Sequence, residues 1–342
     1  MRDLTARISS KLLSDRKITH LFLVVAGVFV IFSLLKPDLF FTVRNITSMS
    51  YQFPEVAILS LAVMLSMLTG GIDLSIVSVS NMAALTAAFI IVNHTHQGSS
   101  NVYLWIVLAI AAGLMTGLIG GWVNAFLISK INVTPILATL ATLTLFNGLA
   151  VGIRNGESIT GLPAEFLRLG NGSLFGVPVP LVVLIIVSIA VALYINKTGL
   201  GLKTFLVGTN RTAARYSALG DRRVIMITYM VSGVLSSVAG LVIASRASSA
   251  SPDYGSSYVL LAIVVVVLGG VSPFGGFGTV TGVIMSAFLL QMVSSGFDAL
   301  RFSQFFYQLA EGATLVLVMI LNSYVERRAL SKGVKRRKSG IS

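Results

Sequence analysis

Long apolar runs, separated by short polar stretches, fill most of this 342-residue sequence. A helix needs about 20 mostly apolar residues to cross the hydrocarbon core of a bilayer. About ten segments approach that length and composition: residues 18–35, 46–69, 76–92, 102–128, 133–152, 177–195, 224–244, 257–271, 274–296 and 302–324. This pattern predicts an all-α, polytopic membrane protein of about ten transmembrane helices. The eighth and ninth segments are so close together that one of them could belong to a re-entrant pair.

The composition excludes several classes of protein. Charged residues make up only 11% of the chain and hydrophobic residues 55%, whereas an average soluble domain has about 25% charged residues. This balance excludes a soluble globular domain, a disordered chain and a coiled coil. The chain has no cysteine, so a disulfide scaffold, a thiolate metal site and a cysteine nucleophile are excluded too. The net charge of +13 indicates membrane topology, so we expect the lipid bilayer and no nucleic acid among its partners.

The basic residues predict how the chain is oriented. Ten spans place both termini on one side, and cytoplasmic loops carry an excess of lysine and arginine. Most of the 25 such residues fall in residues 1–17, 196–223 and 325–342. The opposite side holds Lys36, Arg44, Arg154, Arg168, Arg246 and Arg301. We therefore predict cytoplasmic termini, a single transmembrane domain at 18–324 and a basic cytoplasmic tail at 325–342.

Three carboxylates fall in or beside the predicted spans. Glu55 is in the second span, Asp73 follows it, and Glu311 is in the tenth. A charge in the hydrocarbon region costs at least about 2.5–3.5 kcal/mol, so each carboxylate requires a local environment that stabilises it. Glu55 and Glu311 can lie near a helix end or in a wet cavity. Asp73 can be the N-cap of the third helix, a role compatible with lining a transport path.

Catalytic signatures are missing from the sequence. It contains no HExxH, no GxSxG and no Walker A motif, which are typical of zinc peptidases, hydrolases and ATP-binding sites. We therefore expect a transport subunit rather than an enzyme, with no cofactor and no metal site. Its energy would come from an ion gradient or from a partner ATPase.

Glycines form two patterns. Gly113, Gly117 and Gly121 recur at every fourth residue of the fourth span, a spacing that favours close helix packing in lipid. A glycine-rich break at 268–276 loosely echoes residues 68–71. Paired breaks of this kind can mark an internal repeat and a binding site.

The basic loop 196–223 contains a predicted short helix. Asn210 can cap the start of this helix, and Gly220 can end it. The result would be a two-turn amphipathic helix at the membrane surface, where the small Ala213 and Ala214 let a partner approach closely. A solvated basic loop that serves only topology is the alternative.

Several motifs in order carry a family resemblance. They are GGIDLS at 70–75, TGLGLKTFLVGTNRTAARYSALG at 198–220 and the glycine-rich stretch at 268–282. With these motifs the sequence resembles the permease subunits of monosaccharide-type ABC importers, the ribose, rhamnose and autoinducer-2 group. The resemblance extends over nearly the whole chain.

The resemblance implies a permease in a bacterial inner (plasma) membrane that pairs with a second permease chain. It implies two further partners: a cytoplasmic ABC ATPase subunit and a periplasmic or extracellular sugar-binding protein. By the same likeness, the loop 196–223 couples the permease to the ATPase. The coupling residues would be Gly208, Asn210, Ala213, Ala214 and Gly220.

Some positions depart from the family pattern. Val77 replaces a glycine, residues 259–263 lack two usual acids, and Asn147 and Glu311 stand where many members have basic residues. These departures leave the fold expectation intact. They leave open the substrate and whether the second permease chain is identical or a paralogue.

The preferred hypothesis is the translocation subunit of an ATP-driven importer for a small neutral sugar or sugar-like molecule. Its candidate path residues are Glu55, Asp73, Asn147 and Glu311. The main alternative is a gradient-driven secondary transporter in which Glu55, Asp73 and Glu311 carry protons or bind sodium. An ATPase-coupled exporter of lipids or polymers is a second alternative, and a membrane enzyme is disfavoured by the missing motifs.

Overall fold

The computed structural model describes residues 2–95 and 101–303, together with residues 305, 306, 309, 312, 313 and 316. In this part the named elements are helices, apart from one hairpin of two short strands. Its elements are α1 (Arg2–Leu35), α2 (Pro37–Phe40), α3 (Val43–Leu68), α4 (Ile76–His94), α5 (Val102–Ser129), α6 (Pro135–Arg154), α7 (Ala164–Asn171), β1 (Ser173–Leu174), β2 (Val177–Pro178), α8 (Val179–Lys197), α9 (Gly199–Thr209), α10 (Arg211–Tyr216), α11 (Asp221–Ala247), α12 (Tyr258–Leu268) and α13 (Val280–Ala299). The predicted all-α class is confirmed.

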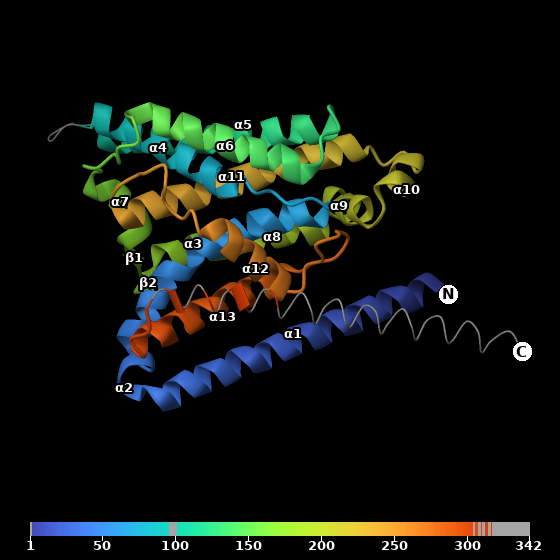
Figure 1. Ribbon diagram of the computed structural model, residues 1–342, viewed down its shortest axis with the longest axis horizontal. Helices are drawn as coiled ribbons and strands as arrows, with labels where there is room; N and C mark the ends of the chain where they lie inside the picture. Colours follow the sequence, from blue (N-terminus) through green and yellow to red (C-terminus); the bar gives the residue numbers. More distant parts are fainter. Residues whose placement is uncertain are drawn as a thin grey trace, which may run out of the picture.

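The long helices lie side by side and give the bundle two distinct ends (Figure 1). Helices α9 and α10 lie at one end, which we call the α10 end. The short helices α2 and α7 and the β1–β2 hairpin lie at the other, which we call the α7 end. β1 and β2 are antiparallel, with Leu174 opposite Val177.

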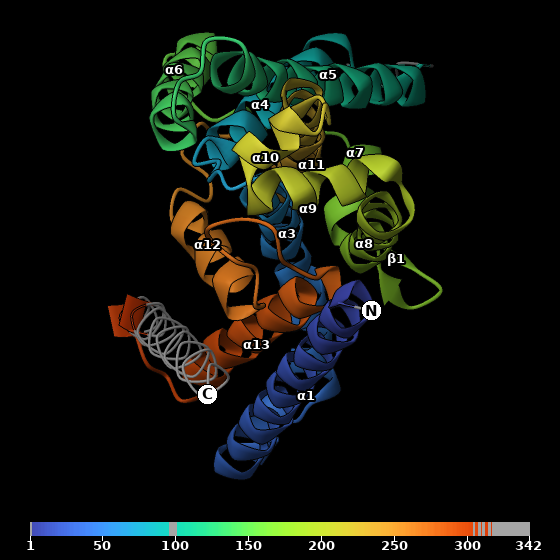
Figure 2. The same cartoon turned by 90° about the vertical axis from the view of Figure 1, so that its right-hand side faces the viewer.

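Helix α3 forms the centre of the bundle, surrounded by its neighbours in Figure 2. In its most apolar window 83% of the residues are buried, against 67% in α4 and α11 and 22–28% in α5, α6 and α8. The outer helices therefore present apolar side chains outwards, as helices in contact with lipid do. Helix α1 lies at the edge and packs mainly against α13, with Phe32 in ring contact with Phe297 at 6.3 Å.

Seven helices of the described part are long and apolar enough to cross a membrane, namely α3, α4, α5, α6, α8, α11 and α13. Two shorter apolar helical stretches are Thr19–Leu35 and Tyr258–Leu268. Each of these nine matches one predicted span. Most of the tenth, at 302–324, lies outside the described residues, so ten crossings stay a prediction.

The structure also corrects the ninth and eighth spans. Helix α13 begins at 280 rather than 274, because Gly275 and Gly276 have positive φ angles of 90° and 77° and the Thr279 hydroxyl caps the helix. Helix α12 has 11 residues and is therefore about 16 Å long, roughly half the hydrocarbon thickness. It is too short to cross a membrane by itself.

The glycine row on α5 packs as predicted. A Cβ on Gly117 would overlap the carbonyl oxygen of Gly233 in α11, and a Cβ on Gly121 would overlap that of Tyr229. A Cβ on Gly113 would lie 3.1 Å from the carbonyl oxygen of Ala83 in α4, a tight contact. Close backbone contact of α5 with α11 therefore requires glycine at positions 117 and 121, and the contact with α4 favours glycine at position 113.

Candidate coupling and translocation site

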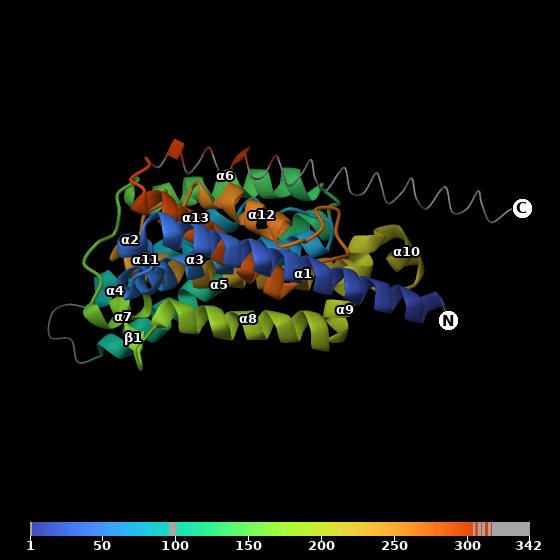
Figure 3. The ribbon, with the colours of Figure 1, turned by 90° about the horizontal axis from the view of Figure 1, so that it is seen from below.

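The predicted coupling loop forms two helices, α9 and α10, which continue from the end of α8 (Figure 3). The side chain of Asn210 accepts a hydrogen bond from the backbone N–H of Ala213 at 2.9 Å, so the predicted cap is confirmed. The predicted end is wrong, because α10 stops at Tyr216 and Gly220, with φ of 62°, instead precedes α11. Helix α9 was not predicted, since its glycines and mixed polarity resemble a loop.

The two neighbouring alanines of α10 face in opposite directions. Ala214 is only 4% exposed and packs in one apolar cluster with Val207 and Val224. Ala213 is exposed. The expectation that both alanines face a partner is therefore wrong for Ala214. An Arg211–Asp221 ion pair at 3.0 Å ties α10 to the start of α11.

Three chain segments interlock at the α10 end of the bundle. The backbone N–H of Gly276 donates to the carbonyl of Leu68, the last residue of α3, at 3.1 Å. Gly208 of α9 lies against both groups so closely that a Cβ would overlap the Leu68 carbonyl oxygen. Gly275 similarly contacts the backbone of Gly70 and Gly208. We call this contact of α9, the α3 end and the α12–α13 loop the glycine junction.

The predicted echo between the two glycine-rich breaks has a structural counterpart. Gly70 and Gly270 have φ angles of 81° and 82°. In both turns the glycine N–H donates to the carbonyl three residues earlier, and the next N–H donates to the carbonyl five residues before it. This is the helix-ending turn that a left-handed glycine allows, so α3 and α12 end in the same way.

Asp73 is the centre of a buried polar network rather than the N-cap itself. It is 2% exposed, and Ser75, not Asp73, is the N-cap of α4. The Asp73 Oδ1 accepts hydrogen bonds from the backbone N–H of Ser75 at 3.0 Å and from its hydroxyl at 2.7 Å. Asn124 of α5 donates to the Ser75 hydroxyl at 2.7 Å, and Thr142 of α6 donates to Asn124 at 2.5 Å. The network joins the start of α4 to α5 and α6.

Glu55 is paired rather than isolated. Its carboxylate accepts two hydrogen bonds from Arg246, through Nε and through Nη2, the second at 3.0 Å. The side chain of Glu55 is 1% exposed and that of Arg246 is 33% exposed. Arg246 lies in the last turn of α11, whereas its sequence position suggested a loop. Sequence reasoning missed this partner because the two residues are 191 positions apart.

Glu55 and Asp73, two of the predicted path residues that the structure describes, are not in contact with one another. The backbone N–H of Asp73 donates to the hydroxyl of Ser66 at 3.2 Å, and Ser66 lies eleven residues, roughly 16 Å, along α3 from Glu55. Asn147 lies on α6, and its buried Oδ1 has no hydrogen-bond partner among the described residues. Glu311 lies outside the described residues.

A non-helical segment that sequence reasoning treated as an external loop enters the bundle between α11 and α12. It comprises residues 248–257, SSASPDYGSS. The side-chain amide of Asn81, in α4, donates to the carbonyls of Pro252 at 2.7 Å and Tyr254 at 2.9 Å. The signal available in the sequence was the shortness of the following apolar run.

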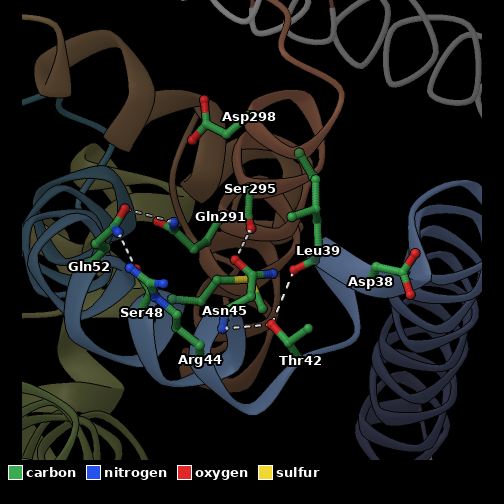
Figure 4. A pocket seen from close by; sticks show the side chains of 12 residues that line it. Asp38, Leu39, Thr42, Arg44, Asn45, Ser48, Gln52, Gln291, Ser295 and Asp298 are labelled. Carbon is green, nitrogen blue, oxygen red and sulfur yellow. Dashed lines mark hydrogen bonds between the residues drawn. The ribbon is translucent and has the colours of Figure 1, made fainter.

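A polar cavity of about 510 Å³ lies at the α7 end between the start of α3 and the end of α13 (Figure 4). Its amides and hydroxyls satisfy one another: Gln291 donates to Gln52 at 3.3 Å, and Ser295 donates to Asn45 at 2.7 Å. These bonds tie α3 to α13. Charged side chains of Asp38, Arg44 and Asp298 also line the cavity.

The chain is similar in sequence to known transport permeases. The family described as branched-chain amino acid transport system / permease component matches residues 45–320. A ribose import permease protein of Bacillus subtilis is 33% identical over 295 residues, 86% of this chain and 88% of the relative. An autoinducer 2 import system permease protein of Yersinia pseudotuberculosis is 32% identical over 291 residues, 83% and 85% of the two chains. An L-arabinose transport system permease protein of Escherichia coli is 31% identical over 304 residues, 89% and 90%. No solved structure matches the chain.

The matched region extends from α3 through α13 and so contains the Asp73 network, α9 and α10, and the glycine junction. Its relatives are transport permeases, in agreement with the absence of catalytic motifs. The chain therefore belongs to the family of branched-chain amino acid transport system permease components, as a permease subunit of the monosaccharide-type ABC importers and not as an enzyme.

Proposed function

We propose that this chain is the translocation subunit of an ATP-driven importer for a small neutral sugar or sugar-like molecule. The relatives are named for ribose, autoinducer 2 and L-arabinose, which favours a hydroxyl-rich substrate. In this proposal residues 18–324 form one permease domain of a bacterial inner membrane protein. The α10 end faces the cytoplasm and an ABC ATPase, and the α7 end faces a sugar-binding protein. A second permease chain completes the path.

The glycine junction is the observation that supports coupling most directly. Helix α9, which precedes α10, is in backbone contact with Leu68 at the end of the central α3 and with Gly276 before α13. Closely packed backbone transmits displacement because it has no room to absorb it. A push on α10 by a closing ATPase would therefore move the ends of α3 and α13 together. The exposed Ala213 is then the small residue that allows the ATPase to approach.

The contacts of the carboxylates favour ATP coupling over a proton or sodium relay. A relay requires carboxylates that exchange protons or sodium ions with one another or with water. Glu55 is held by Arg246. Asp73 accepts two hydrogen bonds from Ser75, and its backbone N–H donates to Ser66, eleven residues and roughly 16 Å along α3 from Glu55. Both are therefore better suited to holding helices together than to exchanging protons.

The first test is purification of the full chain from its native membrane in mild detergent, with identification of its companions. We expect an ATPase subunit with Walker motifs and ATP-dependent uptake after reconstitution. Purification alone, together with solute uptake under an ion gradient without ATP, would overturn the proposal in favour of secondary transport. ATP-dependent efflux without any binding protein would favour the exporter.

A matched pair of substitutions then tests the coupling assignment. Ala213→Arg places a large charged side chain on the exposed face of α10, whereas Ser173→Arg makes a similar change at the exposed β1 of the α7 end. We expect Ala213→Arg to abolish ATPase association and uptake while the chain stays monodisperse. Ser173→Arg should retain the ATPase. Normal association and uptake by Ala213→Arg would contradict the assignment.

A further inference from the structure

The segment 248–257 is non-helical backbone inside a bundle of membrane helices. Helix α11 ends at Ala247, and α12 begins only at Tyr258. In lipid, every backbone polar group must be satisfied, so irregular backbone at membrane depth occurs only where it is buried in protein or lines a water-filled cavity. The Asn81 side chain donates hydrogen bonds to two of the carbonyls of the segment. These bonds fix the position of the segment in the bundle.

The depth of the segment follows from α4. Asn81, which binds the carbonyls on both sides of Asp253, lies about 13 residues before the end of α4 at His94, roughly 20 Å along the helix. The hydrocarbon core is about 30 Å thick. Ser80 is also in backbone contact with Gly240, which lies seven residues, roughly 10 Å, before the end of α11. The carbonyls that flank Asp253 therefore lie roughly 10–20 Å below the α7 ends of α4 and α11, within the length that these membrane helices span.

The chemistry of the segment is incompatible with lipid. Asp253, Ser256 and Ser257 are exposed on the surface of the chain. Asp253 forms no ion pair with any residue that the structure describes. A carboxylate facing hydrocarbon is strongly disfavoured and marks substrate pathways when it occurs. The exposed face of this segment therefore requires water in contact with it.

We propose that segment 248–257 is a polar wall of the translocation path, and that Asp253, with Ser256 and Ser257, binds the hydroxyl groups of the passing sugar. This proposal rests on the proposed function. A carboxylate supplies two acceptor oxygens, and serine hydroxyls both donate and accept. Such a set matches a neutral polyol and repels a phosphorylated or anionic sugar. The carbonyl contacts of Asn81 hold the segment at its depth.

Cysteine accessibility tests the wall independently of the substrate. The chain has no native cysteine, so Asp253→Cys, Ser256→Cys and Ser257→Cys each introduce a single thiol into the full chain. The matched control is Ile189→Cys on α8, a 55% exposed apolar position. In permeabilised membranes containing the assembled transporter, a charged methanethiosulfonate should label the segment at least about tenfold faster than the control, because the thiolate reacts in water. Equal, slow labelling at all four positions with and without ATP would overturn the proposal.

Ribose and arabinose then test the sugar contact. We expect millimolar ribose or arabinose, delivered with the binding protein, to slow labelling of Asp253→Cys but not of Ile189→Cys. Asp253→Leu should raise the sugar concentration for half-maximal uptake by about tenfold or more, as loss of a charged hydrogen bond does, while Asp253→Asn should have a smaller effect. The sugar contact would be refuted if Asp253→Cys is labelled fast, sugar does not slow this labelling, and Asp253→Leu leaves the affinity of uptake unchanged. Fast labelling in a chain with no ATP-dependent uptake would instead refute the proposed function and leave the water-lined wall standing.

Discussion

The buried pair of Glu55 and Arg246 predicts an asymmetric response to substitution. Arg246→Met leaves a carboxylate without its partner on the central helix α3, where its side chain is 1% exposed. Glu55→Gln leaves an arginine whose side chain is 33% exposed and whose long stem allows the guanidinium to move towards water. The first change should therefore destabilise the protein more than the second, although each removes the same ion pair.

The magnitudes follow from the cost of an unpaired charge. Removing one partner of a buried ion pair costs about 3–5 kcal/mol, and the full amount is expected for Arg246→Met. For Glu55→Gln the exposed guanidinium reduces the cost to about 1–2 kcal/mol. The double variant should be more stable than Arg246→Met by about 1–3 kcal/mol, because the orphaned carboxylate is gone.

Reversible unfolding of the purified chain in mixed detergent micelles, with SDS as the denaturant, measures these differences as a double-mutant cycle. Leu260→Met, at a 64% exposed apolar site, is the control for a methionine substitution and should change stability by less than about 0.5 kcal/mol. Equal costs for the two single variants, or additivity in the double variant, would refute the assignment of an uncompensated buried charge. ATP-dependent uptake by the double variant would additionally exclude an essential proton-carrying role for Glu55.

Other substitutions test the packing and the polar network. Gly121→Ala should cost about 1–3 kcal/mol or more, since its Cβ would overlap backbone of α11. Gly148→Ala, inside α6 with nothing within 4 Å, should stabilise by up to about 1 kcal/mol in the same unfolding assay. Asp73→Asn keeps an acceptor for Ser75 and should cost less than about 1 kcal/mol, whereas Asp73→Leu leaves both Ser75 donors unpaired and should cost about 2–4 kcal/mol. Equal losses for Asp73→Asn and Asp73→Leu would show that the charge itself is required. Gly208→Ala should reduce ATP-driven uptake while Gly199→Ala, which has open space, should not.

The sequence predicts the long helices well because each crossing requires a long apolar run, a local property. The matched spans agree with their helices within a few residues except where glycines intervene, as before α13. Asn210 was predictable for the same reason, since its cap acts over three residues. Helix α9 was missed because its glycines and mixed polarity resemble a loop, although the Thr198 hydroxyl caps its start by accepting a hydrogen bond from the N–H of Gly201 at 3.0 Å.

The sequence does not show how deep a segment lies in the bundle or which distant residues it contacts. Arg246 was placed in a loop because it follows an apolar run, and only the fold brings it to Glu55. Segment 248–257 has the composition of a surface loop, and its depth is set by Asn81, 171 positions away from Pro252. The opposite orientations of Ala213 and Ala214 depend on how α10 packs against α11.

The position of α1 at the edge of the bundle has a consequence for biosynthesis. Helix α1 emerges from the ribosome well before its main packing partner α13, which begins only at Val280. At about 5–20 residues per second, those roughly 250 intervening residues take on the order of 10–50 s to make. During that time the apolar stretch Thr19–Leu35 must reside in lipid without its partner. This stretch must therefore be stable in the membrane without contacts to α13. We expect its docking on α13 through Phe32 and Phe297 among the last steps of assembly.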